Sequence, residues 1–81
     1  MVAMPEITVD ARGMACPGPI SALTRAYRNA QNGDLIIVLA TDPGFEPDVK
    51  AWVERTKNEL VELAKVDGNV IKAVIKVTAK K

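Results

Sequence analysis

DLIIVLAT, residues 34–41, is an uninterrupted apolar run with turn-forming residues on both sides. Asn32-Gly33 precedes this run and Asp42-Pro43-Gly44 follows it. A run of this length, without alternation of apolar and polar residues, is typical of a strand whose two faces are both largely covered. We therefore place residues 34–41 in the centre of a sheet and interpret the flanking segments around them.

The segments before this strand predict a shorter strand and a helix. Residues 5–10 are predicted to be extended, because residues 7–9 (ITV) are all β-branched. A helical pattern follows residues 16–19 (CPGP), and Asn32-Gly33 closes it. Apolar residues recur in this helix at spacings of three or four, which marks a buried face: Ile20, Leu23, Tyr27 and Ala30.

The segments after the central strand predict a helix and a hairpin. Pro47 should open the helix, which should end near Lys57-Asn58. Its buried face comprises Val49, Trp52, Val53 and Thr56. Residues 60–66 and 70–77 are predicted strands, joined by a hairpin signal at residues 67–69 (DGN). Residues 59–65 also have helical spacing, but the strand is preferred because the last strand needs a partner.

The order of elements is therefore β-α-β-α-β-β. Right-handed crossovers then give an α+β, two-layer sandwich with a four-stranded mixed sheet and both helices on one face. The 81 residues allow one domain, residues 1–81. In the last strand the alternate residues 71, 73, 75 and 77 should face the helices. The other set is partly apolar, which is compatible with a monomer or a weak dimer: Val70, Lys72, Val74 and Lys76.

Composition excludes several classes of function. Eleven basic and ten acidic side chains leave a net charge of +1, which gives no support to nucleic-acid binding. The N-terminal MVAMP is unlike a signal peptide, and no apolar run approaches the roughly 18 residues of a membrane span. One cysteine and no histidine exclude an internal disulfide, a Cys-His nucleophile and a zinc site within one chain. We expect a cytoplasmic protein without metal or cofactor.

Cys16 is the candidate functional residue, because it stands at a predicted junction between loop and helix. The positive end of the helix dipole favours the thiolate, which is the reactive form of cysteine. Pro17 and Pro19 have no N–H to donate, so they are better explained as fixing the backbone, while Gly18 can still donate. Pro17 also biases Cys16 towards an extended backbone, which should present the thiol outward.

Three interpretations of Cys16 compete. A lone cytosolic cysteine is often a buried hydrophobic residue, but flanking prolines and glycine argue against a core position. A redox thiol would need a resolving partner, and the chain has no second cysteine. A covalent carrier needs one exposed nucleophilic thiol and little else, so this interpretation fits best.

Other polar and aromatic residues have simpler interpretations. Arg12, four residues before Cys16, could add a positive charge near the thiolate or meet a carboxylate of a partner. Asp10 is more easily explained as fixing the loop. Met14 and Phe45 could frame an apolar docking rim. The remaining assignments are a core anchor for Trp52, a turn or cap for Asp42, and a solvated or partner-binding helix face for Arg25 and Arg28.

Residues 9–19, VDARGMACPGP, resemble the signature of the TusA/SirA family of sulfur carriers, L-D-x-x-G-L-x-C-P-x-P. A second block, residues 41–45 (TDPGF) leading to Asp48 and Trp52, is also similar to the family pattern. The resemblance implies that Cys16 carries persulfide sulfur on a scaffold of Pro17 and Pro19. It further implies a cysteine desulfurase or rhodanese-type donor and a DsrE-like or other thiol acceptor, in tRNA thiolation or dissimilatory sulfur metabolism. Such a protein is a sulfurtransferase-like carrier rather than a turnover enzyme.

The sequence departs from the family pattern at several positions. Lys57 stands where many relatives have glycine, and Pro47 is unusual unless it begins the helix. Two rival functions also stay open. Fold analogy with a translation-factor domain suggests an RNA-binding module, and a regulatory thiol or interaction protein would involve no sulfur transfer.

Overall fold

The computed structural model describes residues 6–14, 18–66 and 68–78. Within them lie two helices and one four-stranded sheet with the strand order β1-β2-β4-β3. The elements are β1 (Glu6–Ala11), α1 (Gly18–Asn29), β2 (Leu35–Ala40), α2 (Phe45–Thr56), β3 (Glu59–Val66) and β4 (Val70–Lys76). β1 and β2 are parallel, whereas β4 is antiparallel to both β2 and β3. The predicted order of elements and the mixed sheet are confirmed.

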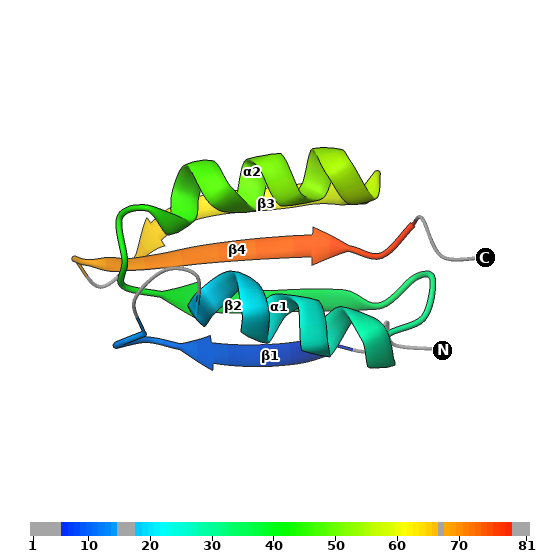
Figure 1. Cartoon of the computed structure of the whole chain (residues 1–81), viewed down its shortest axis with the longest axis horizontal. Coiled ribbons are helices and arrows are strands. Elements are labelled where there is room, and N and C mark those ends of the chain that lie inside the picture. Colours follow the sequence, from blue (N-terminus) through cyan, green and yellow to red (C-terminus); the bar gives the residue numbers. More distant parts are fainter. Residues whose placement is uncertain (1–5, 15–17, 67, 79–81) are drawn as a thin grey trace.

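Both helices cover the same face of the sheet, as Figure 1 shows. The core lies between these two layers and contains alternate residues of β2 and β4, which are fully or almost fully buried. The helices contribute Leu23, Val49 and Trp52 from the predicted buried faces. The opposite face of β2 is only half-buried, so the central strand is less completely covered than its apolar run predicts.

The strand register defines two opposite edges of the sheet. Glu6 pairs with Leu35 and Leu35 with Lys76, so β1 begins and β4 ends at one edge. At the other edge Ala11 pairs with Ala40 and Ala40 with Ile71. The loops that follow β1 and β2 therefore leave the sheet at this second edge, which also carries the β3–β4 turn.

The hairpin prediction is confirmed and the helical alternative for residues 59–65 is wrong. β3 pairs with β4 along its length, with a bulge between Leu60 and Glu62. Residues 71, 73, 75 and 77, predicted to face the helices, are buried. Val74 lies on the opposite face of the sheet, yet it is only 8% exposed. The open face of the sheet is therefore less apolar at its surface than the sequence suggests.

α2 begins at Phe45 and not at Pro47. The Phe45 N–H donates to the carbonyl oxygen of Asp42 at 3.0 Å, which starts the helix two residues earlier than predicted. Pro47 lies in the first turn, where a missing N–H costs little because that group has no partner within the helix.

α1 ends at Asn29, before the predicted closing pair Asn32-Gly33. The Asp34 carboxylate accepts the Gln31 N–H at 2.9 Å, and the Gly33 N–H donates to the Val77 carbonyl at 2.8 Å. With these bonds the segment forms a separate turn, which fixes the position at which the chain enters β2. Of the helices in the described part of the chain, none combines the length and the apolar character needed to cross a membrane.

Lys57 ends α2 in a left-handed conformation, with φ 60° and ψ 30°. Its N–H donates to the Glu54 carbonyl, and the Asn58 N–H donates to the Val53 carbonyl. This is the hydrogen-bond pattern of a Schellman motif, in which glycine is the favoured left-handed residue. A side chain with a Cβ atom costs about 1 kcal/mol or more in this conformation.

Lys57→Gly is therefore expected to raise the free energy of unfolding. We expect a gain of about 0.5–1 kcal/mol, because relief of the left-handed strain outweighs the added flexibility of the unfolded chain. Urea unfolding followed by circular dichroism measures the change. Lys50→Gly, on the exposed surface of the same helix, is the control and should be destabilising. A loss of stability in Lys57→Gly would contradict the inference that the left-handed conformation of Lys57 is strained.

Candidate functional site

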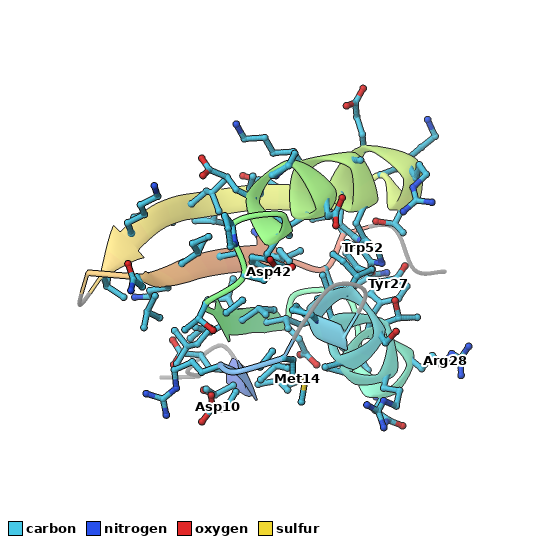
Figure 2. All side chains as sticks on the ribbon, turned by 60° about the vertical axis from the view of Figure 1, so that its left-hand side comes forward. Asp10, Met14, Tyr27, Arg28, Asp42 and Trp52 are labelled. Atoms are coloured by element: carbon cyan, nitrogen blue, oxygen red, sulfur yellow. The ribbon has the colours of Figure 1, made fainter. Side chains whose placement is uncertain are left out.

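The candidate site lies at the sheet edge where β1 and β2 end. Figure 2 shows Asp10, Met14 and Asp42 at this end of the molecule. Of the predicted site residues, Arg12, Gly18 and Pro19 are described by the structure. Cys16 and Pro17 lie outside the described residues.

Asp10 of β1 and Arg12, just after this strand, form a two-pronged ion pair where the chain turns towards Cys16. The Arg12 Nε and Nη2 atoms donate to the two carboxylate oxygens of Asp10, each at 2.8 Å. The Arg12 backbone N–H also donates to Asp10 Oδ1, at 3.2 Å. Asp10 thus offsets the charge of Arg12 and fixes the loop, which is the role that the sequence favours for it. Each side chain is 54% exposed, so solvent screens the pair.

These hydrogen bonds lower the pKa of Asp10 from 3.8 to about 2. The bonds from the Arg12 side chain have the largest effect, and the bond from the Arg12 backbone N–H has the next largest. Because the folded-state pKa is depressed, the pair stabilises the folded chain above pH 3.8, and this contribution is lost as the pH falls towards 2. NMR titration of the Asp10 carboxyl carbon should give a midpoint near pH 2. In Arg12→Gln the midpoint should return towards the ordinary value, whereas in Arg25→Gln it should not move. An unchanged midpoint in Arg12→Gln would contradict the assignment.

A tight turn over residues 11–14 redirects the chain after β1. The Met14 N–H donates to the Ala11 carbonyl at 3.2 Å, and Gly13 has φ 84°. Gly13 occupies the third position of the turn, where a type II turn requires a positive φ and hence favours glycine. The Gly13 N–H donates to the Thr41 hydroxyl oxygen at 2.9 Å. This bond fastens the loop after β1 to the end of β2.

The start of α1 packs against the same turn. A Cβ atom on Gly18 would lie 3.0 Å from the Met14 Cβ atom, closer than side chains normally approach. Pro19 is fully buried beneath it. Gly18 therefore allows close contact between the turn and the helix, and Pro19 anchors the helix to the core. The scaffold role predicted for Pro17 and Pro19 around Cys16 stays a prediction, since residues 15–17 lie outside the described residues.

The second sequence block forms the neighbouring loop. The Asp42 carboxylate accepts the Gly44 N–H at 3.3 Å, so Asp42 acts in a turn, as expected. Phe45 is only 1% exposed and belongs to the core. The prediction that Phe45 frames a docking rim is wrong, because its ring is the first buried anchor of α2. Met14, 41% exposed, does present apolar surface at this edge.

The two helices contact each other through aromatic residues. The Trp52 Nε1–H donates to the Thr24 hydroxyl at 3.2 Å, and the rings of Trp52 and Tyr27 lie edge to face at 5.2 Å. Trp52 is therefore a core anchor, as predicted. Arg25 and Arg28 are on the exposed face of α1, and Figure 2 shows Arg28 pointing away from the body of the molecule.

Comparison with known families identifies the group of proteins to which the chain is related. The profile of the family described as "Sulfurtransferase TusA" matches residues 7–77, almost the whole chain. The chain belongs to the TusA family. The matched region includes both loops of the candidate edge and the segment that contains Cys16.

Relatives in the TusA family carry the name "Putative sulfur carrier protein". One from Archaeoglobus fulgidus is 35% identical over 69 residues, covering 85% of this chain and 90% of the relative. One from Aquifex aeolicus is 36% identical over 64 residues, covering 79% of this chain but only 32% of that longer protein. The crystal structure of a SirA-like protein from Desulfitobacterium hafniense superposes with a TM-score of 0.79 at 25% identity. This superposition covers 89% of this chain and 97% of that one.

Sequence reasoning missed the role of Thr41 in this TusA-family site. Thr41 belongs to the second block, but only the fold brings its hydroxyl to Gly13, which is 28 positions away. The parallel pairing of β1 and β2 was the available signal, because it places the ends of both strands at one edge.

Proposed function

We propose that this chain is a sulfur carrier and that Cys16 holds the transferable sulfur as a persulfide. The observation that carries the proposal is the match of the TusA family across residues 7–77. This region contains the only cysteine of the chain. The relatives from Archaeoglobus fulgidus and Aquifex aeolicus, both named "Putative sulfur carrier protein", support the same role.

The surroundings in sequence and fold suit a reactive thiol. Cys16 stands two positions before Gly18, the first residue of α1. The positive end of a helix dipole favours the thiolate, and the first turn of α1 contains no acidic side chain to oppose it. Asp10 pairs with Arg12, and the Gly13–Thr41 bond fastens the turn before Cys16 to the end of β2.

The proposed reaction consists of two exchanges of one sulfur atom. The Cys16 thiolate attacks the terminal sulfur of a donor persulfide, R–S–SH. The S–S bond of the donor breaks, R–S⁻ leaves, and Cys16–S–SH forms. An acceptor thiolate then attacks the outer sulfur and Cys16 departs as a thiolate, so no external oxidant or reductant is needed. The chain ends each cycle unchanged and acts as a carrier rather than a catalyst.

Both exchanges require partner proteins at the same edge of the sheet. The proposed donor is a cysteine desulfurase or a rhodanese-type protein, and the proposed acceptor is a DsrE-like or other thiol protein. tRNA thiolation and dissimilatory sulfur metabolism are the candidate pathways, in the cytoplasm. Arg25 and Arg28 extend along α1 from this edge and provide positive charge for an acidic partner surface.

Intact-mass spectrometry tests the proposal. The reduced protein is incubated with a cysteine desulfurase and L-cysteine, and its mass should rise by one sulfur atom. Peptide mapping should place that atom on Cys16, and dithiothreitol should remove it. Mass spectra that show no added sulfur would favour a regulatory thiol or interaction protein. A salt-dependent RNA complex that is unaffected by Cys16→Ser would favour the RNA-binding alternative.

A further inference from the structure

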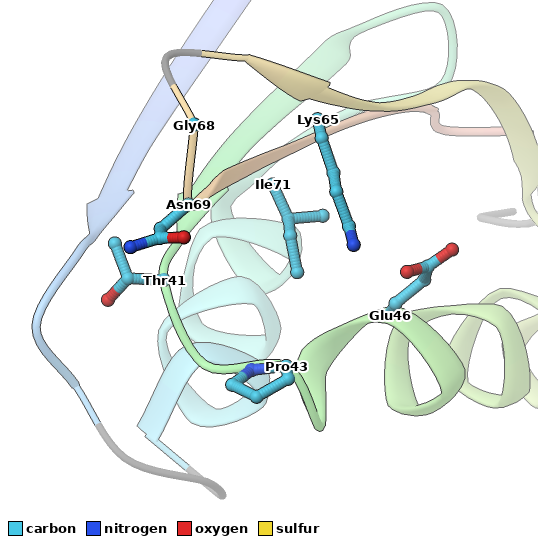
Figure 3. A pocket seen from close by; sticks show the side chains of 7 residues that line it. All are labelled: Thr41, Pro43, Glu46, Lys65, Gly68, Asn69 and Ile71. Atoms are coloured by element: carbon cyan, nitrogen blue, oxygen red, sulfur yellow. The ribbon is translucent and has the colours of Figure 1, made fainter.

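A hollow of about 310 Å³ lies beside the candidate site. Figure 3 shows it between the first turn of α2, which carries Glu46, and the β3–β4 hairpin, which carries Lys65 and Asn69. Thr41 lines its wall, and the Thr41 hydroxyl also accepts the Gly13 N–H from the loop before Cys16. Thr41 therefore contacts both the hollow and the loop that leads to Cys16.

Opposite charges face each other across the hollow. In Figure 3 the Lys65 ammonium and the Glu46 carboxylate point toward one another from a strand and a helix. The two groups do not form an ion pair with each other. A ligand that carries both a negative and a positive group would satisfy both side chains at once. A simple anion would be opposed by Glu46, and a simple cation by Lys65.

Neutral groups complete the hollow. Asn69 and Thr41 line the hollow and provide amide and hydroxyl groups for hydrogen bonds. Ile71 and Pro43 give apolar surface for a small side chain. Ligand sites in proteins commonly occupy about 300–1,000 Å³, so this hollow suits a molecule at the small end of that range.

We propose that this hollow binds a free α-amino acid, with Lys65 taking its carboxylate and Glu46 its ammonium group. The amino acid of choice is cysteine or its persulfide, and this choice rests on the proposed sulfur-carrier function. Because Thr41 both lines the hollow and accepts the Gly13 N–H, a bound amino acid would lie near the turn that leads to Cys16. The site would thus allow a small thiol, and not only a protein, to meet the carrier.

NMR titration of the reduced ¹⁵N-labelled protein with three small thiols tests the site. L-cysteine carries both charged groups, cysteamine lacks the carboxylate and 3-mercaptopropionate lacks the ammonium group. L-cysteine should shift the amide signals of Thr41, Asn69 and Ile71 in a saturable manner. Each of the other two thiols should bind at least about tenfold more weakly, since each loses one charged hydrogen-bonded contact.

Variants identify the groups responsible. Lys65→Met and Glu46→Gln should each weaken L-cysteine binding about tenfold or more, while Lys50→Met and Glu54→Gln, on the exposed surface of α2, should not. The site is refuted if L-cysteine gives no saturable shifts, or if either truncated thiol binds equally well. Equal binding by Lys65→Met would also refute it. The readout involves no sulfur transfer, so a protein that is loaded by the desulfurase but does not bind L-cysteine overturns this inference alone.

Discussion

Cys16→Ser is expected to abolish sulfur loading completely. Serine has nearly the same size as cysteine, but its hydroxyl is not ionised at neutral pH and cannot carry a persulfide. Incubation with a desulfurase and L-cysteine, followed by intact-mass spectrometry, should show no added sulfur. A second measurement, transfer of labelled sulfur to a thiol acceptor, should show the same loss.

The matched control for this variant is Glu59→Gln. Glu59 is exposed and begins β3 opposite Lys76, at the end of the sheet away from the candidate site. Glu59→Gln should therefore load one sulfur atom as the parent protein does. Residual loading of Cys16→Ser would show that sulfur does not reside on residue 16, and it would contradict the carrier mechanism.

The largest effect on stability is expected for Trp52→Ala. Trp52 is 4% exposed, and its ring contacts Tyr27 and its indole N–H donates to Thr24. Removing a buried tryptophan side chain typically costs about 3–5 kcal/mol. Small domains have a free energy of unfolding of about 0.05–0.15 kcal/mol per residue, so this loss removes much of the stability of an 81-residue chain.

Urea unfolding followed by far-UV circular dichroism measures this loss without relying on the fluorescence of the single tryptophan. Thr24→Val is the control, because it keeps the shape of the side chain and removes only the hydroxyl that accepts the indole N–H. It should cost about 1 kcal/mol. If Trp52→Ala cost no more than Thr24→Val, packing between the two helices would not depend on the tryptophan ring.

The architecture could be predicted from periodicity, because each element has a clear apolar pattern. The alternation in residues 70–77 and the spacing of Leu23, Val49 and Trp52 correctly assign the buried faces. The sequence does not locate the start of α2, because Pro47 is compatible with several positions in a first turn. The prediction for Phe45 fails for the same reason, since a residue placed before the helix is expected in a loop. Only the glycine of relatives marks Lys57 as unusual.

The site was less predictable than the fold. The sequence favours a loop-fixing role for Asp10, but the direct pairing of Asp10 with Arg12 is a property of the turned backbone. The Thr41–Gly13 bond joins loops that are distant in the chain. The opposition of Glu46 and Lys65 depends on how α2 lies over β3, and no local pattern encodes that arrangement. Sequence indicates which residue types are available, and the fold determines which of them meet.

The pairing of Glu6 with Leu35 and of Leu35 with Lys76 has a practical consequence for attachment. Polypeptide joined ahead of β1 or behind β4 emerges from the edge opposite the Asp10–Arg12 loop. An affinity tag, a fluorescent fusion or a tether to a solid support can therefore be added at either side without blocking access to that loop. The same geometry lets such a unit be built into a longer polypeptide, as in the Aquifex relative, where the matched region makes up 32% of the length.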